Sequence, residues 1–471
     1  MAHDFLLKHN YGIKLDMIEE KIKEIHYLIQ SNDLTKAKQT ILELIKKHPL
    51  SYDLRNLMGL VEAKKDNYKK AISFFKEAIN INPKLIGAYI NTGVAYEKLN
   101  ELFESIKYLK KAIKINPNLE IVYNSLAKVF SKNNQYNDAI LNFKKAIKIN
   151  PTNYENYFNL ANTLSLTFDY KNAILNYKKI DRKEKKFGDI NFLIAENFRK
   201  LKKIKEALKY YNLSQHEKKM VRILDCYLFL NLKNKYLNEI KLISQDNSND
   251  RRIAASSAYI SDQFNIKNEY PFCPNPLDLI YKTNIEKYFS KPDKYLMSLF
   301  KEITSQNFKW EPSGKTTVNG YGTVGNLSEK KLPKMNELEK IIMEELHSYY
   351  LKFKKNKINF ISNWPNKFKI VSWSNRLKRE GHNIPHIHPS GWVSGVFYLK
   401  IPNKISGNEA GIEFSLHGDD HHVIKKNIPK TSIQPKIGDM ILFPSSLFHR
   451  TIPFSSNEER VCVAFDLCKV N

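Results

Sequence analysis

The chain has 471 residues, of which 76 are Lys or Arg and 49 are Asp or Glu, and its net charge is +27. This length is sufficient for two or three domains, each with its own core. Residues 1–270 carry 47 basic and 30 acidic side chains, and residues 271–471 carry 29 and 19, so the positive charge is spread along the whole chain. This spread disfavours a localised nucleic-acid interface, and we expect no specific nucleic-acid binding.

The cysteine content and the apolar segments of the sequence indicate the cellular compartment in which the protein is expected. The four cysteines show no C-x-x-C pairing, which disfavours a disulfide framework or a zinc knuckle. The first residues contain no apolar segment of signal-peptide length, and no apolar run approaches the roughly 18 residues of a membrane helix. We therefore expect a cytoplasmic protein with no membrane association.

The first part of the chain is periodic. Pro49, Pro83, Pro117 and Pro151 are 34 residues apart, and the last three follow an asparagine, a pair that commonly ends a helix. Small residues recur with the same period. They are Gly59, Gly93, Ala127 and Ala161, where the first helix of each unit must approach its partner, and Ala37, Ala71, Ser105, Ala139 and Ala173, which open the second helix.

This pattern resembles the tetratricopeptide repeat, in which each unit of 34 residues forms two helices. Four consecutive units match, a degenerate unit is expected before them from about residue 17, and further units are expected to about residue 245. Because one helix pair cannot bury its own apolar face, we predict an all-α superhelix over residues 1–245 with a concave groove. The resemblance implies a peptide or protein partner in that groove.

The chain changes character after the repeats. The polar residues 244–252 interrupt the periodicity, so residues 246–270 are predicted to form a linker that includes a short helix at 253–261. Beyond residue 271 two amphipathic helices are predicted, at 292–305 and 332–353. Short β-rich runs follow at 368–375, 392–400, 411–416, 439–443 and 461–467. This order predicts an α+β domain over residues 271–471 whose strands form a double-stranded β-helix, or jelly roll.

Three histidines and an arginine lie in this strand-rich region. His386 and His388 are two positions apart, and side chains at i and i+2 of a strand face the same side. His449 follows the run at 439–443 and its turn, from where a neighbouring strand would bring it to the same point. Arg460 opens the last strand and is followed on its face by small residues at 462 and 464. The pattern suggests an iron site beside a slot for a small dicarboxylate.

Residues 368–467 resemble the 2-oxoglutarate- and Fe(II)-dependent oxygenases. The resemblance is to a bacterial branch whose blocks read H-x-H-P, S-G-V-x-Y-L, G-D-x-x-x-F-P, H and R, and residues 310–327 resemble the lead-in to those blocks. It implies Fe(II) and 2-oxoglutarate as cofactors, with oxidative decarboxylation to succinate and CO2 coupled to oxidation of a C–H bond. The cofactors carry that chemistry, and the protein supplies geometry, charge and a dry pocket.

The resemblance also assigns roles to individual residues. His386 and His449 match the two histidine ligands of the family. Arg460 matches the residue that would hold the distal carboxylate of 2-oxoglutarate, and Tyr398 matches a tyrosine that would assist it. Asn375 and Trp373 lie on the strand predicted before the motif and are expected to line the pocket.

His388 departs from the family pattern, because most members have aspartate or glutamate at this position. Three interpretations remain open. In the first, His388 is a neutral third ligand of the iron. In the second, His388 does not bind the metal and water takes its place. In the third, the site binds a different metal or none. The first gives a catalytic and metal-binding set of His386, His388 and His449.

Three further features have a simpler interpretation. The run His417-Gly418-Asp419-Asp420-His421-His422 resembles a metal site, but its polar surroundings predict a solvated loop. Glu413 is a stray candidate ligand, and Asp439 is interpreted as a turn residue after Gly438.

The leading hypothesis is a 2-oxoglutarate-dependent dioxygenase, expected to be a hydroxylase, whose repeats help to present a peptide, protein or small-molecule substrate. The alternative is an interaction scaffold with a catalytically silent jelly roll. The presence of Arg460 and Tyr398 argues against the scaffold hypothesis, since a domain without catalytic activity has no need of residues that bind the co-substrate carboxylate. A sugar-modifying or cell-surface biosynthetic enzyme is a third hypothesis.

Overall fold

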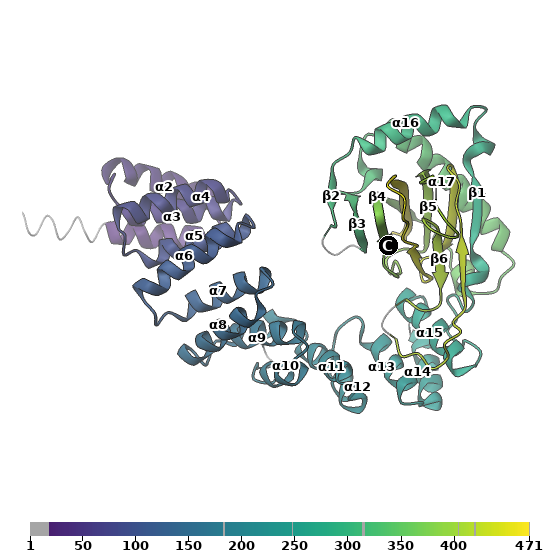
Figure 1. Ribbon diagram of the computed structural model, residues 1–471, viewed down its shortest axis with the longest axis horizontal. Helices are drawn as coiled ribbons and strands as arrows, with labels where there is room; N and C mark the ends of the chain where they lie inside the picture. Colours follow the sequence, from purple (N-terminus) through teal and green to yellow (C-terminus); the bar gives the residue numbers. More distant parts are fainter. Residues whose placement is uncertain are drawn as a thin grey trace, which may run out of the picture. The chain divides into compact units, whose positions relative to one another are not determined.

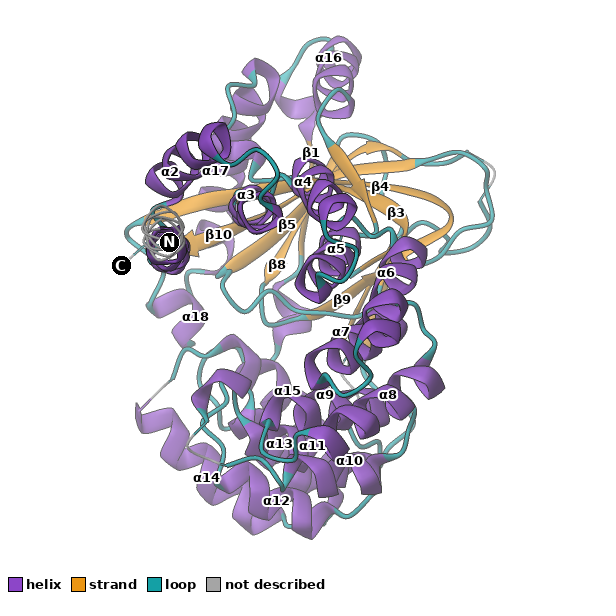
Figure 2. Ribbon diagram, turned by 90° about the vertical axis from the view of Figure 1, so that its left-hand side faces the viewer, coloured by secondary structure: helices purple, strands orange, loops and turns teal. Residues whose placement is uncertain are grey.

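The computed structural model describes residues 18–181, 184–246, 248–312, 316–403, 405–418 and 421–470. The chain forms two compact units, residues 1–210 and residues 211–471. All the strands of the described part belong to the second unit, as Figure 1 and Figure 2 show. No helix among the described residues is long and apolar enough to cross a membrane.

The first unit is a tetratricopeptide-like superhelix built from successive helix pairs. Residues 18–30 form its first helix. The others are α2 (Leu34–Lys47), α3 (Tyr52–Lys64), α4 (Tyr68–Ile81), α5 (Ile86–Lys98), α6 (Leu102–Ile115), α7 (Glu120–Lys132), α8 (Tyr136–Ile149), α9 (Tyr154–Leu166), α10 (Tyr170–Tyr177), α11 (Ile190–Lys200) and α12 (Ile204–Asn212).

The Asn-Pro pairs end helices for a visible reason. Asn82 follows α4 as its C-cap, and its backbone N–H still donates to the carbonyl of Ala78. Its side-chain Oδ1 accepts from the N–H of Lys84 at 3.0 Å, across the proline that lacks an N–H of its own. Asn116 and Asn150 make the same two bonds at the ends of α6 and α8.

A left-handed residue recurs every 34 positions, directly after the first helix of each pair. These residues are Asn32, Asp66, Asn100, Asn134, Phe168 and Lys202, with φ between 58° and 64°. Asparagine and aspartate adopt this conformation more readily than other non-glycine residues, which accounts for the first four positions. The 34-residue spacing of these residues therefore runs through six units, the last of which contains Lys202. The extension of the repeats to about residue 245 stays a prediction.

The small residues allow the two helices of a unit to approach closely. A Cβ placed on Gly59 would lie 2.3 Å from the ring of Phe75 on α4, and one on Gly93 would lie 2.7 Å from Leu109 on α6. Ala127 and Ala161 are fully buried at the equivalent places. The predicted close contacts are confirmed.

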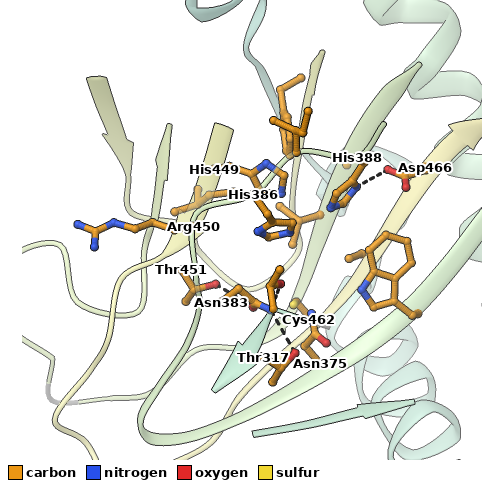
Figure 3. A pocket seen from close by; sticks show the side chains of 18 of the residues that line it. Thr317, Asn375, Asn383, His386, His388, His449, Arg450, Thr451, Cys462 and Asp466 are labelled. Atoms are coloured by element: carbon orange, nitrogen blue, oxygen red, sulfur yellow. Dashed lines mark hydrogen bonds and ion pairs between the residues drawn. The ribbon is translucent and has the colours of Figure 1, made fainter. Parts of the chain in front are cut away.

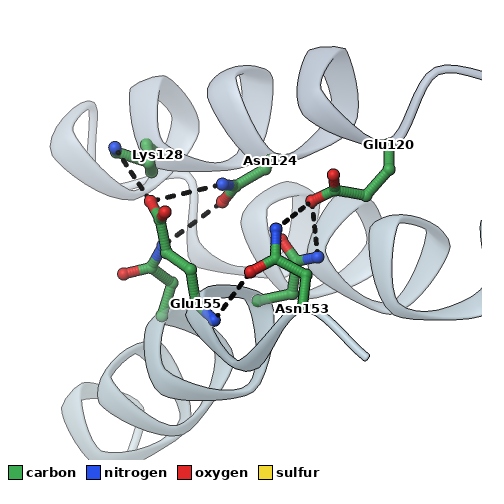
Figure 4. A network of polar contacts seen from close by, with 7 residues as sticks. Glu120, Asn124, Lys128, Asn153 and Glu155 are labelled. Atoms are coloured by element: carbon green, nitrogen blue, oxygen red, sulfur yellow. Dashed lines mark hydrogen bonds and ion pairs between the residues drawn. The ribbon is translucent and has the colours of Figure 1, made fainter. Parts of the chain in front are cut away.

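Successive units are also joined by polar side chains. Asn124 on α7 accepts a hydrogen bond from Asn159 on α9 at 3.2 Å, and Glu120 accepts bonds from Asn153 and Asn156 (Figure 4). Asn56 and Asn91 form the corresponding bond between α3 and α5 at 3.0 Å. These bonds connect the first helices of neighbouring repeats.

The second unit combines helices with two antiparallel sheets. Its α-helices are α13 (Lys219–Phe229), α14 (Lys233–Asp246), α15 (Arg251–Phe264), α16 (Pro292–Thr304), α17 (Pro333–Phe353) and α18 (Asn359–Ser362). Its strands are β1 (Tyr281–Asn284), β2 (Phe308–Trp310), β3 (Thr317–Thr323), β4 (Phe368–Asn383), β5 (Val393–Lys400), β6 (Ile412–Ser415), β7 (Lys430–Ile433), β8 (Asp439–Pro444), β9 (Phe448–Thr451) and β10 (Arg460–Lys469).

The larger sheet has the order β1-β8-β5-β10-β4-β3-β2, and the smaller has the order β7-β6-β9. Odd-numbered residues of β10, such as Val461 and Phe465, belong to a core that includes α16 and α17. Cys462 belongs instead to a second core with Phe414 of the smaller sheet. The two sheets thus pack face to face, an arrangement consistent with the predicted jelly roll.

Several predicted elements are confirmed and others were missed. The helices at 292–305 and 332–353 correspond to α16 and α17, and the five predicted strands correspond to β4, β5, β6, β8 and β10. The pattern did not reveal β1, β2, β3, β7 or β9, and β4 continues to Asn383, eight residues beyond its predicted end. Four of the five missed strands have only three or four residues, too few to show an alternating pattern.

The interval predicted as a linker, residues 246–270, contains the buried helix α15. Ile253, Tyr259 and Ile260 of this helix share one hydrophobic core with α13, α14, α16 and α17. The compact unit that carries the sheets therefore begins at Tyr211.

Candidate metal centre

The three candidate histidines come from two segments that exchange backbone hydrogen bonds. His449 lies on β9, and the N–H of each of His386 and His449 donates to the carbonyl of the other at 3.1 Å. The prediction that His386 and His388 lie on a strand was wrong, because β4 ends at Asn383 and only His386 forms an isolated bridge. The segment is pinned at His388 as well, whose N–H donates to Ser445 at 3.0 Å.

The three imidazoles nevertheless converge on one point. His386, His388 and His449 each offer a ligand nitrogen that lies within 4.8 Å of the other two (Figure 3). Their ring centroids are 4.3 to 5.0 Å apart. The structure thus brings together the three residues that the sequence suggested as metal ligands.

Hydrogen bonds assign the tautomer of each ring. Nδ1 of His386 lies 2.7 Å from the carbonyl oxygen of Ile384, and Nδ1 of His449 lies 3.1 Å from that of Leu447. A carbonyl oxygen only accepts, so both Nδ1 atoms carry hydrogen and both Nε2 atoms keep a free lone pair. Nδ1 of His388 lies 2.6 Å from Oδ1 of Asp466, which leaves its Nε2 as the ligand atom too.

Burial keeps two of the rings neutral. Loss of hydration, reinforced by the neighbouring His388, lowers the pKa of His386 to about 4. Burial also lowers the pKa of His449 well below its usual value. Neutral imidazole is the form that binds metals, so both rings are ready for coordination at neutral pH.

The cluster opens into a cavity of about 370 Å³ that Arg460 also lines. Arg460 is 1% exposed, donates from Nε to the carbonyl of Ala410 at 2.9 Å, and lies 4.9 Å from the Tyr398 ring. No carboxylate in the described part of the chain pairs with it. A buried cation without an anion is costly, so this guanidinium is suited to an anionic ligand that enters the cavity.

The other predicted pocket residues differ in their placement. Asn375 and Trp373 line the cavity, and the Trp373 ring lies 5.3 Å from that of His388. Tyr398 does not line it. Its hydroxyl is buried without a hydrogen-bond partner among the described residues, while its ring lies against Arg460. Tyr398 thus lies directly beside Arg460, and its role in helping to hold the co-substrate carboxylate stays a prediction.

Two functional candidates escaped the sequence reasoning. Asp466 lies on the inner face of β10, two positions beyond Ala464, and contacts His388. Ser394 of β5 donates to the same carboxylate at 2.6 Å. The period-2 pattern that placed Cys462 and Ala464 beside Arg460 would have revealed Asp466 if it had been followed one step further.

The histidine-rich run at 417–422 is not the solvated loop that was predicted. His421 is buried, with Nδ1 3.2 Å from Oδ1 of Asp225 on α13 and its ring stacked on Tyr259 of α15. The His421 segment packs against these two helices. A contact between residues so far apart in the sequence could not be predicted from local patterns. Asp419 and Asp420 lie outside the described residues.

The carboxylates of Glu413 and Asp439 do not belong to the histidine cluster. Glu413 accepts from Nε of Arg450 at 2.8 Å and pairs with Lys430 at 3.3 Å. Asp439 follows Gly438, which has φ of +83°, and accepts from the N–H of Lys436 at 2.6 Å, as a turn residue does.

The donor set fits a divalent transition metal. Three imidazoles on one side of a cavity leave positions open for other ligands, and imidazole suits iron, zinc and copper. The cavity also offers to a carboxylate the guanidinium of Arg460, which pairs with no acidic residue in the described ranges. The residues present therefore fit an iron ion together with a 2-oxo dicarboxylate.

Comparison with known families agrees with this geometry. Residues 371–466 match a family model described as "Putative 2OG-Fe(II) oxygenase". Tetratricopeptide repeat models match residues 22–85, 86–119, 121–153 and 142–185. No curated protein matches the sequence.

Several solved structures resemble the chain over about 34% to 43% of its length. MamA from Desulfovibrio magneticus RS-1 is 18% identical, with a TM-score of 0.31 over 34% of this chain and 92% of its own. PilF from Pseudomonas aeruginosa is 14% identical, with a TM-score of 0.33 over 43% and 94%. YrrB, described as a TPR protein with an unusual peptide-binding site, is 15% identical, with a TM-score of 0.33 over 41% and 97%. From the family models, the chain carries tetratricopeptide repeats within residues 22–185 and, at residues 371–466, a domain of the 2OG-Fe(II) oxygenase type.

Proposed function

We propose that this protein is a 2-oxoglutarate- and Fe(II)-dependent dioxygenase, most simply a hydroxylase. The observation that carries the proposal is one cavity lined by three imidazoles with free Nε2 lone pairs and by a buried arginine that has no anionic partner among the described residues. The family match over residues 371–466 supports it. We further propose a cytoplasmic location.

His386, His388 and His449 would hold the iron, and Arg460 would hold the distal carboxylate of the co-substrate. When bound, iron with 2-oxoglutarate and dioxygen supplies the oxidation of a C–H bond, with R–H, 2-oxoglutarate and O2 giving R–OH, succinate and CO2. The protein orients the two ligands. Trp373 and Phe443 contribute aromatic surface to the cavity wall.

The repeats are proposed to recruit the substrate. Tetratricopeptide repeats stack into superhelices with extended concave surfaces that bind partners. A peptide or protein is therefore the favoured substrate, and a small molecule is the alternative. Because a fold does not fix a ligand, this part of the proposal depends on the repeats alone.

The test is anaerobic addition of Fe(II) and 2-oxoglutarate to the metal-free full chain. We expect a visible metal-to-ligand charge-transfer band, followed by succinate release when air is admitted. His449→Ala should abolish the band. Folded, metal-loaded protein that shows neither band nor succinate would refute the proposal in favour of an interaction scaffold.

The role of His388 is tested separately. As a third ligand, His388 should contribute to iron affinity, so His388→Ala should weaken iron binding clearly. Unchanged iron affinity in this variant would instead indicate that water occupies the position.

A further inference from the structure

The histidine that departs from the family pattern has a carboxylate partner. Oδ1 of Asp466 lies 2.6 Å from Nδ1 of His388, and the two residues are 78 positions apart in the sequence. Asp466 is on β10, on the same inner face as Cys462 and Ala464, and all three line the cavity. Figure 3 shows the His388 ring between the Asp466 carboxylate and the other two imidazoles.

The carboxylate is held in place by a small polar cradle. Ser394 donates its hydroxyl to Oδ1 of Asp466 at 2.6 Å, and its Oγ lies 2.8 Å from Oγ of Ser445. The backbone carbonyl oxygen of Ser445 accepts a hydrogen bond from the backbone N–H of His388 at 3.0 Å. Asp466 and His388 are therefore fixed relative to each other by hydrogen bonds from two further segments of the chain.

A glycine makes room for the cradle. A Cβ on Gly391 would lie 2.5 Å from Oγ of Ser445 and 3.1 Å from Cγ of Asp466. A side chain at residue 391 would therefore displace the Ser445 hydroxyl and crowd the Asp466 carboxylate.

The charge of Asp466 needs compensation. The residue is 5% exposed, and no lysine or arginine in the described part of the chain forms an ion pair with it. A buried carboxylate without a Lys or Arg partner is unfavourable even when it is hydrogen-bonded, and a cation bound to the far side of His388 would stabilise it. The carboxylate–histidine–metal arrangement is a recurring way to orient a metal ligand and to raise its basicity.

The other two histidines lack this feature. Nδ1 of His386 and Nδ1 of His449 are bonded to the neutral carbonyl oxygens of Ile384 and Leu447. A charged partner occurs at position 388 alone of the three. Position 388 is also the one at which most members of the family have a carboxylate ligand, whereas this chain has an imidazole.

We propose that Asp466 acts through His388 as a positioning residue, which holds Nε2 toward the metal and supplies from outside the ligand shell the negative charge that a carboxylate ligand would bring. The inference rests on the proposed function only in so far as a metal binds the three histidines. It concerns the metal site itself and holds for whichever divalent ion occupies it.

The test measures metal affinity without co-substrate. Metal-free full-length protein is titrated calorimetrically with Zn²⁺ and with Co²⁺, as wild type and as Asp466→Asn, which keeps an acceptor oxygen but removes the charge. We expect the affinity of the variant to be about 10- to 100-fold lower, the usual effect of losing such a partner. Asp439→Asn removes another buried carboxylate of the same sheet outside the cavity, and it should leave the affinity unchanged.

A double-mutant comparison separates positioning from general destabilisation. If Asp466 acts through His388, then Asp466→Asn should have little further effect on Co²⁺ affinity in a His388→Ala background. The visible Co²⁺ spectrum should also shift in Asp466→Asn but not in Asp439→Asn, because only the former alters a ligand. Wild-type metal affinity in Asp466→Asn, or an equal loss in the His388→Ala background, would overturn the inference.

The outcomes also separate this inference from the proposed function. A charge-transfer band and succinate in the wild type, combined with unchanged Co²⁺ affinity in Asp466→Asn, would leave the oxygenase in place and overturn the role of Asp466. Weaker Co²⁺ binding in Asp466→Asn, with no band in the wild type, would support that role and refute the oxygenase.

Discussion

Arg251 donates a hydrogen bond from Nε to the carbonyl oxygen of Pro389 at 3.0 Å, across 138 positions of sequence. Arg251 opens helix α15, and Pro389 directly follows His388. The same guanidinium lies 5.7 Å from the Trp392 ring and donates to Asn249. The helix that precedes the β-rich region thus holds the turn that carries two of the three candidate ligands.

This contact predicts an effect of Arg251→Ala on the metal site. Loss of the bond frees the Pro389 turn, so we expect a free energy of unfolding lower by about 1–3 kcal/mol and a Zn²⁺ affinity reduced several-fold. Differential scanning fluorimetry and calorimetric titration measure both. The neighbouring Arg252 forms a partly exposed pair with Glu217, so Arg252→Ala should change stability by less than about 0.5 kcal/mol. Equal effects of the two changes would contradict the prediction.

Arg460→Ala should weaken 2-oxoglutarate binding about 10- to 100-fold, since a charge-assisted hydrogen bond to a charged group contributes about 1.5–3 kcal/mol. Titration of the charge-transfer band with 2-oxoglutarate gives the affinity. Iron affinity should remain close to that of the wild type.

Arg450→Ala is the matched control, because Arg450 lines the same cavity but is neutralised by Glu413. Its effect should be much smaller. If the two alanine variants bind 2-oxoglutarate equally well, Arg460 is not the carboxylate-binding residue.

The metal-free protein should lose stability as the pH falls from about 6.5 toward 4. In the unfolded chain a histidine binds its proton near pH 6.5, whereas burial holds the folded-state pKa of His386 at about 4 and lowers that of His449 as well. The unfolded state therefore takes up protons first as the pH falls. Each such histidine removes up to about 1.4 kcal/mol of stability per pH unit in this window.

Thermal unfolding of metal-free protein at several pH values measures this slope. His386→Gln removes one of the two groups, so its melting temperature should depend less on pH than that of the wild type. An unchanged slope would show that His386 does not titrate as its burial implies.

In the repeats, Gly59→Ala should destabilise the first unit, because the added methyl group would meet the ring of Phe75 at 2.3 Å. Overpacking of this kind costs about 1–3 kcal/mol. Gly87 also lies in a helix, yet a Cβ added there would have no atom within 4 Å beyond its chain neighbours and its own helix backbone. Gly87→Ala should therefore be neutral or stabilise by up to about 1 kcal/mol. Urea unfolding followed by circular dichroism distinguishes the two, and a stabilising Gly59→Ala would contradict the close-packed interface.

Much of the first unit was predictable because each signal is local. The Asn-Pro pairs act within a few residues of themselves, as the bonds of Asn82 to Ala78 and Lys84 show. The small residues repeat because each helix meets its sequence neighbour. Even the left-handed residue at Asn100 ends its own helix. Such features depend only on residues close by in the sequence, so they can be predicted from it directly.

The three histidines were also predictable, but their support was not. Their spacing and flanking motifs singled out His386 and His449, although the strand expected to carry His386 is an extended loop. The cradle of Asp466 depends on the register of β10 against β5, in which Asp466 faces Ser394. Register between strands so far apart in the sequence leaves no local signature.

The sequence by itself determined the repeat period, the helices that end at Asn-Pro, and the identity of the candidate ligands, because these depend on side-chain chemistry and short-range backbone preferences. Only the tertiary structure decided that Asp466 partners His388, that α15 fastens the turn at Pro389 and that His421 is buried on Asp225. Those contacts join residues 78, 138 and 196 positions apart. Which of many possible partners meet at such distances is fixed by sheet register and by the packing of helices on the β-rich core.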